Sequence, residues 1–237
     1  MKRVLLIDSL NMFIRAYIMD PSLTMGGNPC GGIKGTLKIL QKLVRETRPD
    51  EIVFIWDGPN GSQKRKAINK NYKAGRKPIR LNRSVKNLTE DEELRNKVWQ
   101  QMRLMEYLNE MPIIQIIIPE VEADDVIAHL THLSHYKGWQ KVIISNDQEY
   151  CENTGSKLKF HKNIIEGQEI IAHNYKMMQL YSPMLSVQSK DFVQNAVENF
   201  ECVFNKIEIM KNMRDDGFGE LNWKDLELHL NKINSEA

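Results

Sequence analysis

The sequence has few cysteines and no long apolar run, and both shortages restrict the class of protein. Its three cysteines are scattered along 237 residues, at Cys30, Cys151 and Cys202, so neither a disulfide framework nor a paired-cysteine metal site is expected. No apolar run approaches the roughly 20 residues that a membrane-spanning helix needs. The first apolar run ends early in an acid, Asp8, which predicts a first strand and not a signal peptide. We therefore expect a protein of the reducing cytoplasm that does not contact a membrane.

Several common catalytic motifs are also missing. The sequence contains no Gly-rich phosphate loop ending in Lys-Ser or Lys-Thr, and no Gly-x-Ser-x-Gly nucleophile elbow. The six histidines are dispersed, and nothing around Cys151 indicates a nucleophile. The acidic residues therefore remain as the candidates for catalytic chemistry.

Charge is present in both signs, but it is unevenly distributed. The formal net charge is only +2, yet the segment from 64 to 86 has no acid and ten basic residues: Lys64, Arg65, Lys66, Lys70, Lys73, Arg76, Lys77, Arg80, Arg83 and Lys86. Such a run is either a solvated linker or helix face, or a surface for a polyanion. Ile68 and Tyr72 interrupt it at near-helical spacing, which favours a helix or arch that follows a phosphate backbone.

Four short apolar runs alternate with helical patterns along the first two thirds of the chain. The runs cover 4–7, 52–56, 113–118 and 141–144, and helical periodicity covers 37–44, 90–111 and 122–133. Thr89 and Glu92 have the spacing of a capping box at the start of the second helix. This alternation predicts an α/β fold with a mostly parallel central sheet flanked by helices. Toward the C-terminus we expect two short amphipathic helices, at 200–213 and 223–233.

Every predicted strand is followed by an acid at or just beyond its carboxyl end. In a parallel sheet these ends meet at one edge, where ligands of open α/β sheets bind. A single acid in such a place is more often a helix cap or turn residue, but acids after all four strands favour a metal site. Carboxylate oxygens without His or Cys suit Mg²⁺ or Mn²⁺, and two such ions could hydrolyse a phosphodiester. The acids are Asp8, Asp57, Glu122, Asp124, Asp125, Asp147 and Glu149.

These residues resemble the 5′-3′ exonuclease/flap endonuclease family, whose catalytic domain is PIN-like, and among its members they are most similar to the bacteriophage enzymes of the RNase H type. The matching segments keep their order over residues 1–150: LIDSLNMFIR (6–15), GGIKG (31–35), FIWDG (54–58), NYKAGRK (71–77), VEADD (121–125) and ISND (144–147). The resemblance implies a catalytic domain over 1–150, with a basic helical arch over about 61–88.

The resemblance also implies a role for individual residues. Asp8, Asp57, Glu122, Asp124 and Asp147 match metal ligands, some of them acting through water, and Asp125 matches an acid that supports the site. Lys73 matches a lysine that contacts the scissile phosphate, where a cation stabilises developing negative charge. Tyr72 matches a base-stacking position and Arg76 a phosphate clamp. The remaining residues expected to bind nucleic acid are Arg15, Lys64, Arg65, Lys66, Lys70 and Lys77.

Two departures from the family pattern affect these expectations. Glu149 stands where the family usually has a second Asp, so the second metal ion is expected to be held more weakly. The helix–three-turn–helix module of the family is not recognisable after Glu149. We therefore expect 151–237 to be a shortened, atypical C-terminal helical region with a reduced grip on duplex DNA.

The sequence thus predicts a metal-dependent 5′-3′ exonuclease or flap endonuclease that removes RNA primers or 5′ flaps in replication and repair. Expected partners are a 5′-flap or nicked DNA duplex, an RNA–DNA hybrid, and a replication protein such as a single-stranded-DNA-binding protein or a clamp. Two alternatives stay open: a relative that binds branched DNA with weakened catalysis, and a PIN-type ribonuclease that acts on single-stranded RNA.

Overall fold

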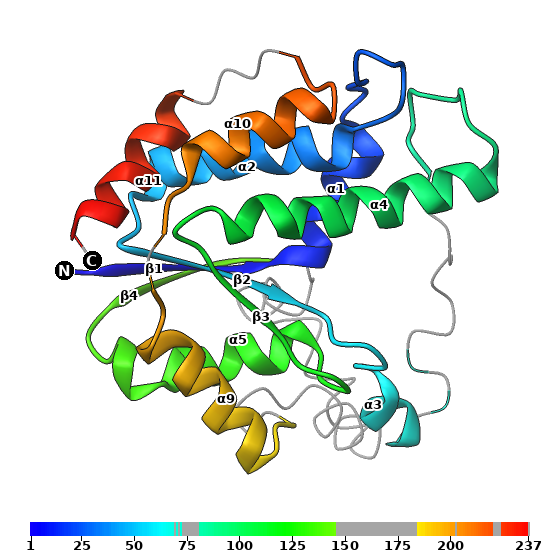
Figure 1. The fold of residues 1–237 in the computed structure, drawn as a ribbon. Coiled ribbons are helices and arrows are strands. Elements are labelled where there is room, and N and C mark those ends of the chain that lie inside the picture. Colours follow the sequence, from blue (N-terminus) through cyan, green and yellow to red (C-terminus); the bar gives the residue numbers. More distant parts are fainter. Residues whose placement is uncertain are drawn as a thin grey trace, which may run out of the picture.

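Four parallel strands form the centre of the molecule (Figure 1). The computed structural model describes residues 1–68, 70, 72, 81–145, 184–201, 203–219 and 224–236. The strands are β1 (Arg3–Asp8), β2 (Glu51–Trp56), β3 (Ile114–Ile117) and β4 (Gln140–Ile144), in the order β3-β2-β1-β4. All three pairings are parallel. The four predicted strands and the predicted parallel sheet are therefore confirmed.

The central strands are apolar along their length because both faces of the sheet are covered. In β1 the residues from Val4 to Ile7 are fully buried. Leu5 and Ile7 belong to one apolar core, whereas Val4 and Leu6 belong to the other. Side chains alternate between the two faces of a strand, so a continuous apolar run is what a strand between two cores requires.

Helices cover both faces of the sheet. One face carries α1 (Ser9–Met19), α2 (Gly31–Thr47), α4 (Glu90–Asn109), α10 (Lys206–Asp215) and α11 (Lys224–Glu236), and the other carries α5 (Ala123–His132) and α9 (Val187–Glu198). The short helix α3 (Gln63–Ile68) lies beyond the end of β2, and the 3-10 helix η1 (Ser134–Tyr136) follows α5. None of the helices in the described part of the chain is long and apolar enough to cross a membrane.

The long helix α4 begins as the sequence predicts. The Thr89 hydroxyl accepts a hydrogen bond from the Glu92 backbone N–H at 3.4 Å, and the Glu92 carboxylate accepts one from the Thr89 backbone N–H at 2.9 Å. This is the reciprocal pattern of a capping box. It also lowers the pKa of the Glu92 carboxyl below its ordinary value, chiefly through the bond from the Thr89 backbone.

A residue of α4 also completes the beginning of α2. The residue before α2, Cys30, makes no side-chain cap. Instead Gln100 of α4, which is fully buried, accepts hydrogen bonds from the backbone N–H groups of Gly32 (2.7 Å) and Ile33 (3.3 Å). Its amide nitrogen donates to the Pro29 carbonyl at 2.8 Å. The first N–H groups of a helix have no partner within the helix, so Gln100 joins α2 to α4.

The C-terminal helices pack into the same two cores as the rest of the chain. Val193 and Val197 of α9 lie in the core beside α5, and Ile209 and Leu226 lie in the core beside α2 and α4. The two amphipathic helices expected near the C-terminus are present as α10 and α11, whereas α9 was not anticipated. The division of the chain at residue 150 stays a prediction.

Candidate functional site

Acids follow three strands at the carboxyl edge of the sheet. Asp8 is the last residue of β1 and is only 7% exposed, and its Oδ1 accepts a hydrogen bond from the Asn11 backbone N–H at 3.1 Å. Asp57 follows β2, and its Oδ1 accepts one from the Ala123 backbone N–H at 2.8 Å. Glu122, which follows β3, occupies the N-cap position of α5 and is buried. The carboxyl ends of these strands therefore lie at one edge of the sheet, as expected.

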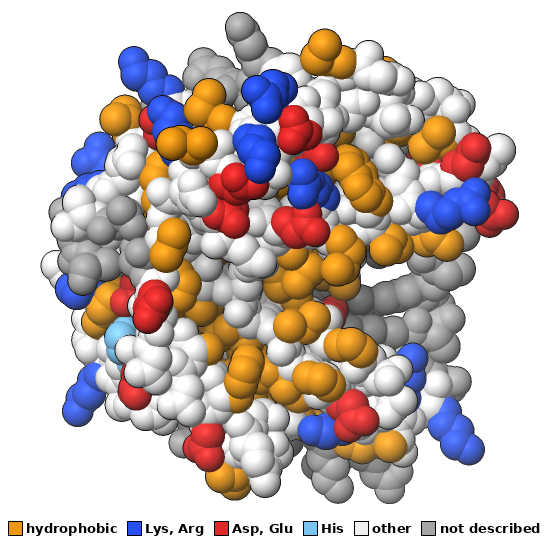
Figure 2. Space-filling view, viewed as in Figure 1, with side chains coloured by type: hydrophobic (Ala, Val, Ile, Leu, Met, Phe, Trp, Pro, Cys, Tyr) orange, Lys and Arg blue, Asp and Glu red, His pale blue; other side chains and the backbone are white. Residues whose placement is uncertain are grey.

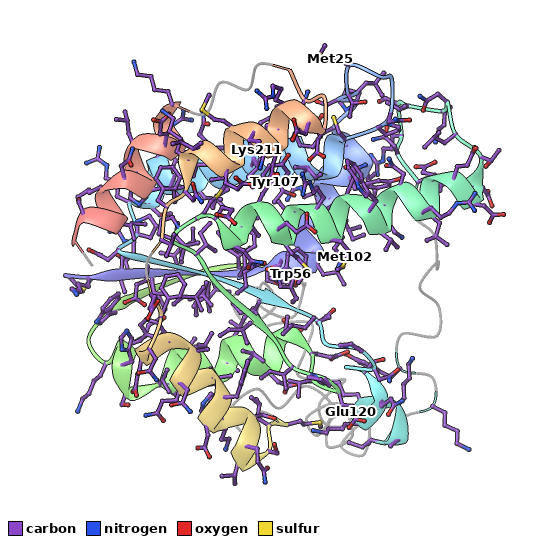
Figure 3. The ribbon with its side chains drawn as sticks, in the orientation of Figure 1. Met25, Trp56, Met102, Tyr107, Glu120 and Lys211 are labelled. Atoms are coloured by element: carbon purple, nitrogen blue, oxygen red, sulfur yellow. The ribbon has the colours of Figure 1, made fainter. Side chains whose placement is uncertain are left out.

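The loop after β2 is held tightly against the loop before α5. The Gly58 backbone N–H donates to the Val121 carbonyl at 3.0 Å, and the Glu120 N–H donates to the Pro59 carbonyl at 2.8 Å. A Cβ atom on Gly58 would lie 1.7 Å from the Ile118 carbonyl oxygen, so only glycine allows this approach. Figure 3 shows Glu120 in this loop, beside α3. Asp57 is thereby fixed next to the beginning of α5.

Arg65 is not on the surface where the sequence predicts it. The residue is 4% exposed, and its guanidinium lies among carboxylates of the candidate site. Nη1 lies 2.7 Å from Glu122 Oε2 and 2.6 Å from Asp125 Oδ2, and Nη2 lies 3.1 Å from Asp125 Oδ1. The expectation that Arg65 binds nucleic acid on the surface is therefore corrected. Arg65 pairs with buried acids instead, because burying a carboxylate without a partner is costly.

Electrostatics keep this guanidinium charged. Burial acts to lower the pKa of Arg65, but hydrogen bonding to Asp125 and the charges of Asp125 and Glu122 outweigh it and raise the pKa above its ordinary value. Tyr72 adds a neutral donor, since its hydroxyl lies 3.1 Å from Glu122 Oε2. Nothing in the sequence distinguishes Arg65 from Lys64 or Lys66, so only the structure reveals its role.

The other basic residues predicted to contact nucleic acid divide into two groups. Arg15, Lys64, Lys66 and Lys70 are exposed. Lys64 also donates a hydrogen bond to the Met184 carbonyl at 3.1 Å. The second group, Lys73, Arg76 and Lys77, lies outside the described residues, so its predicted roles stay predictions.

The chemistry of the acids at this edge suits a hard cation, because they offer carboxylate oxygens alone. Asp124 is half-buried on the first turn of α5, beside Glu122 in sequence. Within the residues that the structure describes, no three His, Cys, Asp or Glu side chains form a group that could hold one ion. The two further predicted ligands, Asp147 and Glu149, lie outside the described residues. The predicted ligand set therefore stays a prediction.

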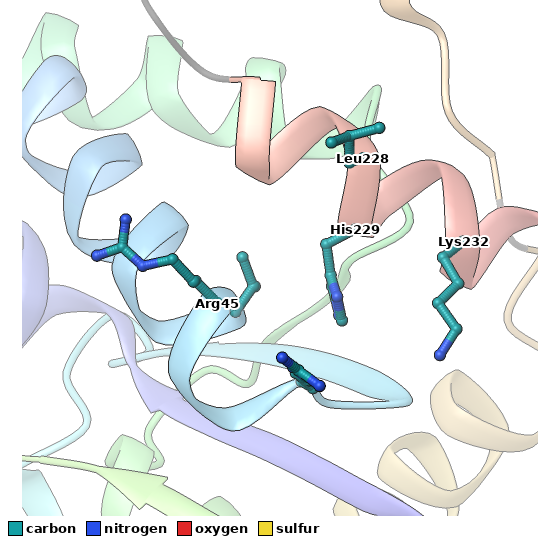
Figure 4. A pocket seen from close by; sticks show the side chains of 6 residues that line it. Arg45, Leu228, His229 and Lys232 are labelled. Atoms are coloured by element: carbon teal, nitrogen blue, oxygen red, sulfur yellow. The ribbon is translucent and has the colours of Figure 1, made fainter.

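Two other surface features are a pocket and a group of exposed apolar side chains. A pocket of about 460 Å³ lies between the end of α2 and α11, lined by Val44, Arg45, Arg48, Leu228, His229 and Lys232 (Figure 4). The end of α2 precedes the start of β2, so this pocket lies toward the amino edge of the sheet. Figure 2 shows hydrophobic side chains gathered in the middle of one face. Exposed apolar residues of α4 and β3 include Val98, Met102 and Ile117.

Fold and site together define an α/β protein of parallel strands with acids at its carboxyl edge and a basic segment beside them. Residues 3–182 match the family model described as "5'-3' exonuclease, N-terminal resolvase-like domain". The chain belongs to this 5′-3′ exonuclease family, which confirms the resemblance seen in the sequence and the class of enzyme it implies.

The chain is also similar to individual proteins. The chain is 27% identical over 232 residues to a 5′-3′ exonuclease of Buchnera aphidicola, covering 89% of this chain and 76% of that protein. It is 28% identical over 193 residues to the flap endonuclease Xni of Shewanella piezotolerans, covering 81% of this chain and 66% of that protein. Among solved structures, the T5 D15 protein co-crystallised with metal ions matches with a TM-score of 0.47 and 14% identity, covering 98% of this chain and 89% of that one.

Proposed function

We propose that this protein is a divalent-metal-dependent 5′-3′ exonuclease and flap endonuclease that hydrolyses phosphodiester bonds in DNA and RNA–DNA hybrids. The observation that carries the proposal is that Asp8, Asp57 and Glu122 follow three neighbouring parallel strands at the carboxyl edge of one sheet, in a chain of the 5′-3′ exonuclease family. Removal of RNA primers or 5′ flaps is the role in replication and repair that this activity would serve.

The acids of the carboxyl edge would hold Mg²⁺ or Mn²⁺. Asp8, Asp57, Glu122, Asp124 and Asp147 are the proposed ligands of the first ion, and Glu149 contributes to a weaker second site. When bound, such ions neutralise phosphate charge and lower the pKa of a bound water. The protein's own contribution is to hold the carboxylates in place. Asp57 is oriented by the Ala123 N–H, and Asp125 is held by Arg65 as a supporting residue.

The basic segment would bind and orient the substrate. Lys73 is proposed to contact the scissile phosphate, where its charge stabilises the transition state. Arg15, Lys66 and Lys70 are exposed cations that could follow the backbone beside the site, with Arg76 and Lys77 continuing the track. Tyr72 is half-buried. Its aromatic ring is proposed to stack on a base of the substrate.

The substrates proposed for this chain follow from its relatives and its charge. A 5′-flap or nicked DNA duplex and an RNA–DNA hybrid are the expected substrates, because relatives are named flap endonucleases and 5′-3′ exonucleases. A replication protein, such as a single-stranded-DNA-binding protein or a clamp, is a further proposed partner. It would supply the grip on duplex that the shortened C-terminal region is expected to lack.

One assay tests the proposal against both alternatives. The purified protein is offered a 5′-flap duplex, an RNA–DNA hybrid and single-stranded RNA, with Mg²⁺ or Mn²⁺ and with EDTA. We expect metal-dependent cleavage of the first two substrates, and its loss in Asp57→Asn. Tight binding without cleavage would show a branched-DNA-binding protein instead, and cleavage confined to single-stranded RNA would show a ribonuclease.

A second experiment separates chemistry from binding. We expect Lys73→Ala to slow single-turnover cleavage far more than it weakens binding. The loss of an interaction that is made only in the transition state lowers the rate and leaves the affinity for substrate unchanged. Lys66→Ala is the matched control, since Lys66 is an exposed cation of the same basic segment. Equal losses of rate and affinity in Lys73→Ala would assign this lysine a binding role alone.

A further inference from the structure

Asn82 attaches the end of the basic segment, residues 64–86, to two helices. The residue is only 3% exposed. Its side-chain Nδ2 donates hydrogen bonds to the backbone carbonyls of Tyr17 at 2.7 Å and Asp20 at 2.9 Å, at the end of α1. Its backbone N–H donates to Oε1 of Glu93, which lies in the first turn of α4. One buried residue therefore sets where the basic segment joins the rest of the fold.

The side-chain amide of Asn82 uses its whole hydrogen-bonding capacity at this junction. An amide offers two N–H donors and one oxygen with two lone pairs. The nitrogen donates to the two carbonyls of α1, and Oδ1 accepts from the backbone N–H groups of Ser84 at 2.9 Å and Val85 at 2.8 Å. The last two bonds shape the turn that follows, as asparagine side chains commonly do. Replacing Asn82 therefore leaves buried polar groups without this partner, which is unfavourable.

The two helices contact each other without the help of Asn82. The Tyr17 hydroxyl of α1 donates a hydrogen bond to the backbone carbonyl of Glu93 in α4, at 3.1 Å. Both residues are buried. Loss of the Asn82 side chain should therefore release the end of the basic segment and leave the contact between α1 and α4 in place.

Two exposed cations, Arg83 and Lys86, follow Asn82 in the chain. The Arg83 backbone N–H donates to the Ile18 carbonyl of α1 at 3.0 Å, and the Lys86 ammonium donates to the Asn82 carbonyl. The helix α3, at the start of the basic segment, and the beginning of α4 lie on the side of the molecule at which β1 and β2 end (Figure 1). Cations that are already held in place bind a phosphate backbone without the loss of freedom that ordering them would require.

We propose that Asn82 is a positioning residue for nucleic-acid binding, which holds Arg83, Lys86 and the end of the basic segment at one place on α1 and α4. This inference rests on the proposed function, in which the basic segment binds the substrate. Without the Asn82 side chain, binding has to order this end of the segment, so the affinity for nucleic acid falls. The affinity for metal should not change, because the hydrogen-bond partners named above are not among the proposed metal ligands.

Hydrogen exchange tests whether Asn82 acts locally. The full chain without nucleic acid is compared as wild type, Asn82→Ala and Asn87→Ala. Asn87→Ala is the matched control, because Asn87 is exposed and its Nδ2 donates a hydrogen bond to the Gly27 carbonyl at 2.8 Å. We expect the backbone amides of 83–86 to exchange about tenfold faster in Asn82→Ala, while those of β1 remain strongly protected. An equal loss of protection in 83–86 and in β1 would show a general loss of stability and overturn the proposal.

Binding measurements test whether this attachment matters for nucleic acid. The affinity of the same three proteins for a 5′-flap duplex is measured by fluorescence anisotropy in EDTA, at about 50 mM salt, where phosphate contacts are strong. We expect Asn82→Ala to bind the duplex about tenfold more weakly than the wild type, and Asn87→Ala to stay within about twofold of it. Calorimetry without DNA should give the same Mn²⁺ affinity for all three proteins, within about twofold, because separate sites act independently.

The outcomes separate this inference from the proposed function. A wild-type protein that does not bind the duplex would refute the proposed function itself. If the wild type binds, equal duplex affinities for Asn82→Ala and Asn87→Ala would overturn the positioning role, and so would parallel losses of duplex and Mn²⁺ affinity in Asn82→Ala.

A second pair of variants decides the question if Asn82→Ala does not fold. Asn82→Asp keeps the oxygen that accepts from Ser84 and Val85 but removes both donors to α1. Asn87→Asp is its matched control, because it adds the same negative charge to the chain. Weaker duplex binding by Asn82→Asp than by Asn87→Asp supports the proposal, and equal binding overturns it.

Discussion

The carboxylate of Asp57 accepts a hydrogen bond from the backbone N–H of Ala123, with 2.8 Å between Oδ1 and the nitrogen. Asp57 follows β2, and Ala123 is the first residue of α5. The first N–H groups of a helix have no partner within the helix, so a side chain from another part of the chain completes the start of α5. The same carboxylate is a proposed metal ligand, and the two roles can be separated by mutation.

Replacing Asp57 by Ala and by Asn should have different effects on stability. Asn keeps an oxygen that accepts from Ala123, whereas Ala does not. We expect Asp57→Ala to lower the free energy of unfolding by about 1 kcal/mol, the typical effect of a lost helix cap, and Asp57→Asn to lower it much less. Both should abolish flap cleavage. Urea denaturation and a cleavage assay measure the two effects, and a cleaving Asp57→Asn protein would contradict the metal role.

Gly58→Ala should destabilise the protein through a backbone clash. The added Cβ would lie 1.7 Å from the Ile118 carbonyl oxygen, so the loop before α5 has to move. We expect a loss of about 2 kcal/mol or more, as for other overpacked sites. Gly26→Ala is the matched control, because its Cβ would meet no atom closer than 3.8 Å. Equal melting temperatures for the two variants would show that the loop before α5 can move without lowering the stability of the protein.

Gln100→Met should weaken the junction between α2 and α4. The substitution leaves the N–H groups of Gly32 and Ile33 and the carbonyl of Pro29 without this partner. Because an unsatisfied buried polar group is unfavourable, we expect the free energy of unfolding to fall by about 1–3 kcal/mol. Gln101→Met makes the same change at the next, half-buried position of α4. A comparable fall in the free energy of unfolding for Gln101→Met would mean that the hydrogen bonds of Gln100 contribute little to stability.

Mild acid should destabilise the protein through His129. Burial, with the nearby charges of Lys190 and His132, lowers the pKa of His129 below its ordinary value. The unfolded chain therefore binds a proton more readily than the folded one. The contribution of neutral His129 to stability is complete above the ordinary histidine pKa of about 6.5, and it declines as the pH falls below that value. Denaturation at pH 7.5 and pH 5.5 measures the difference.

The control for this pH effect is the second histidine of α5. His129 Nε2 is buried and has no hydrogen-bond partner within the described part of the chain, whereas His132 is exposed. We expect His129→Leu to reduce the loss of stability between the two pH values and His132→Leu to reduce it much less. If His129→Leu loses as much stability between pH 7.5 and pH 5.5 as the wild type, the pH dependence comes from other groups.

Many elements could be predicted because their cause is local. The four strands follow from short apolar runs, and the start of α4 follows from Thr89 and Glu92, three positions apart. That Asp8 and Asp57 lie at the same edge of the sheet follows from the rule that alternating strands and helices form a parallel sheet. The helix α9 was not anticipated, although it supplies Val193 and Val197 to one core.

The sequence by itself determined the class of fold, the edge of the sheet at which the acids gather, and the family to which the chain belongs. These depend on periodicity, spacing and motif order, which are properties of neighbouring residues. The tertiary structure decided which charged groups pair. Arg65 and Glu122 are 57 positions apart, and no pattern marks Arg65 among its basic neighbours. Packing of α3 against the start of α5 brings them together, because a buried carboxylate is stable only where the fold supplies a partner.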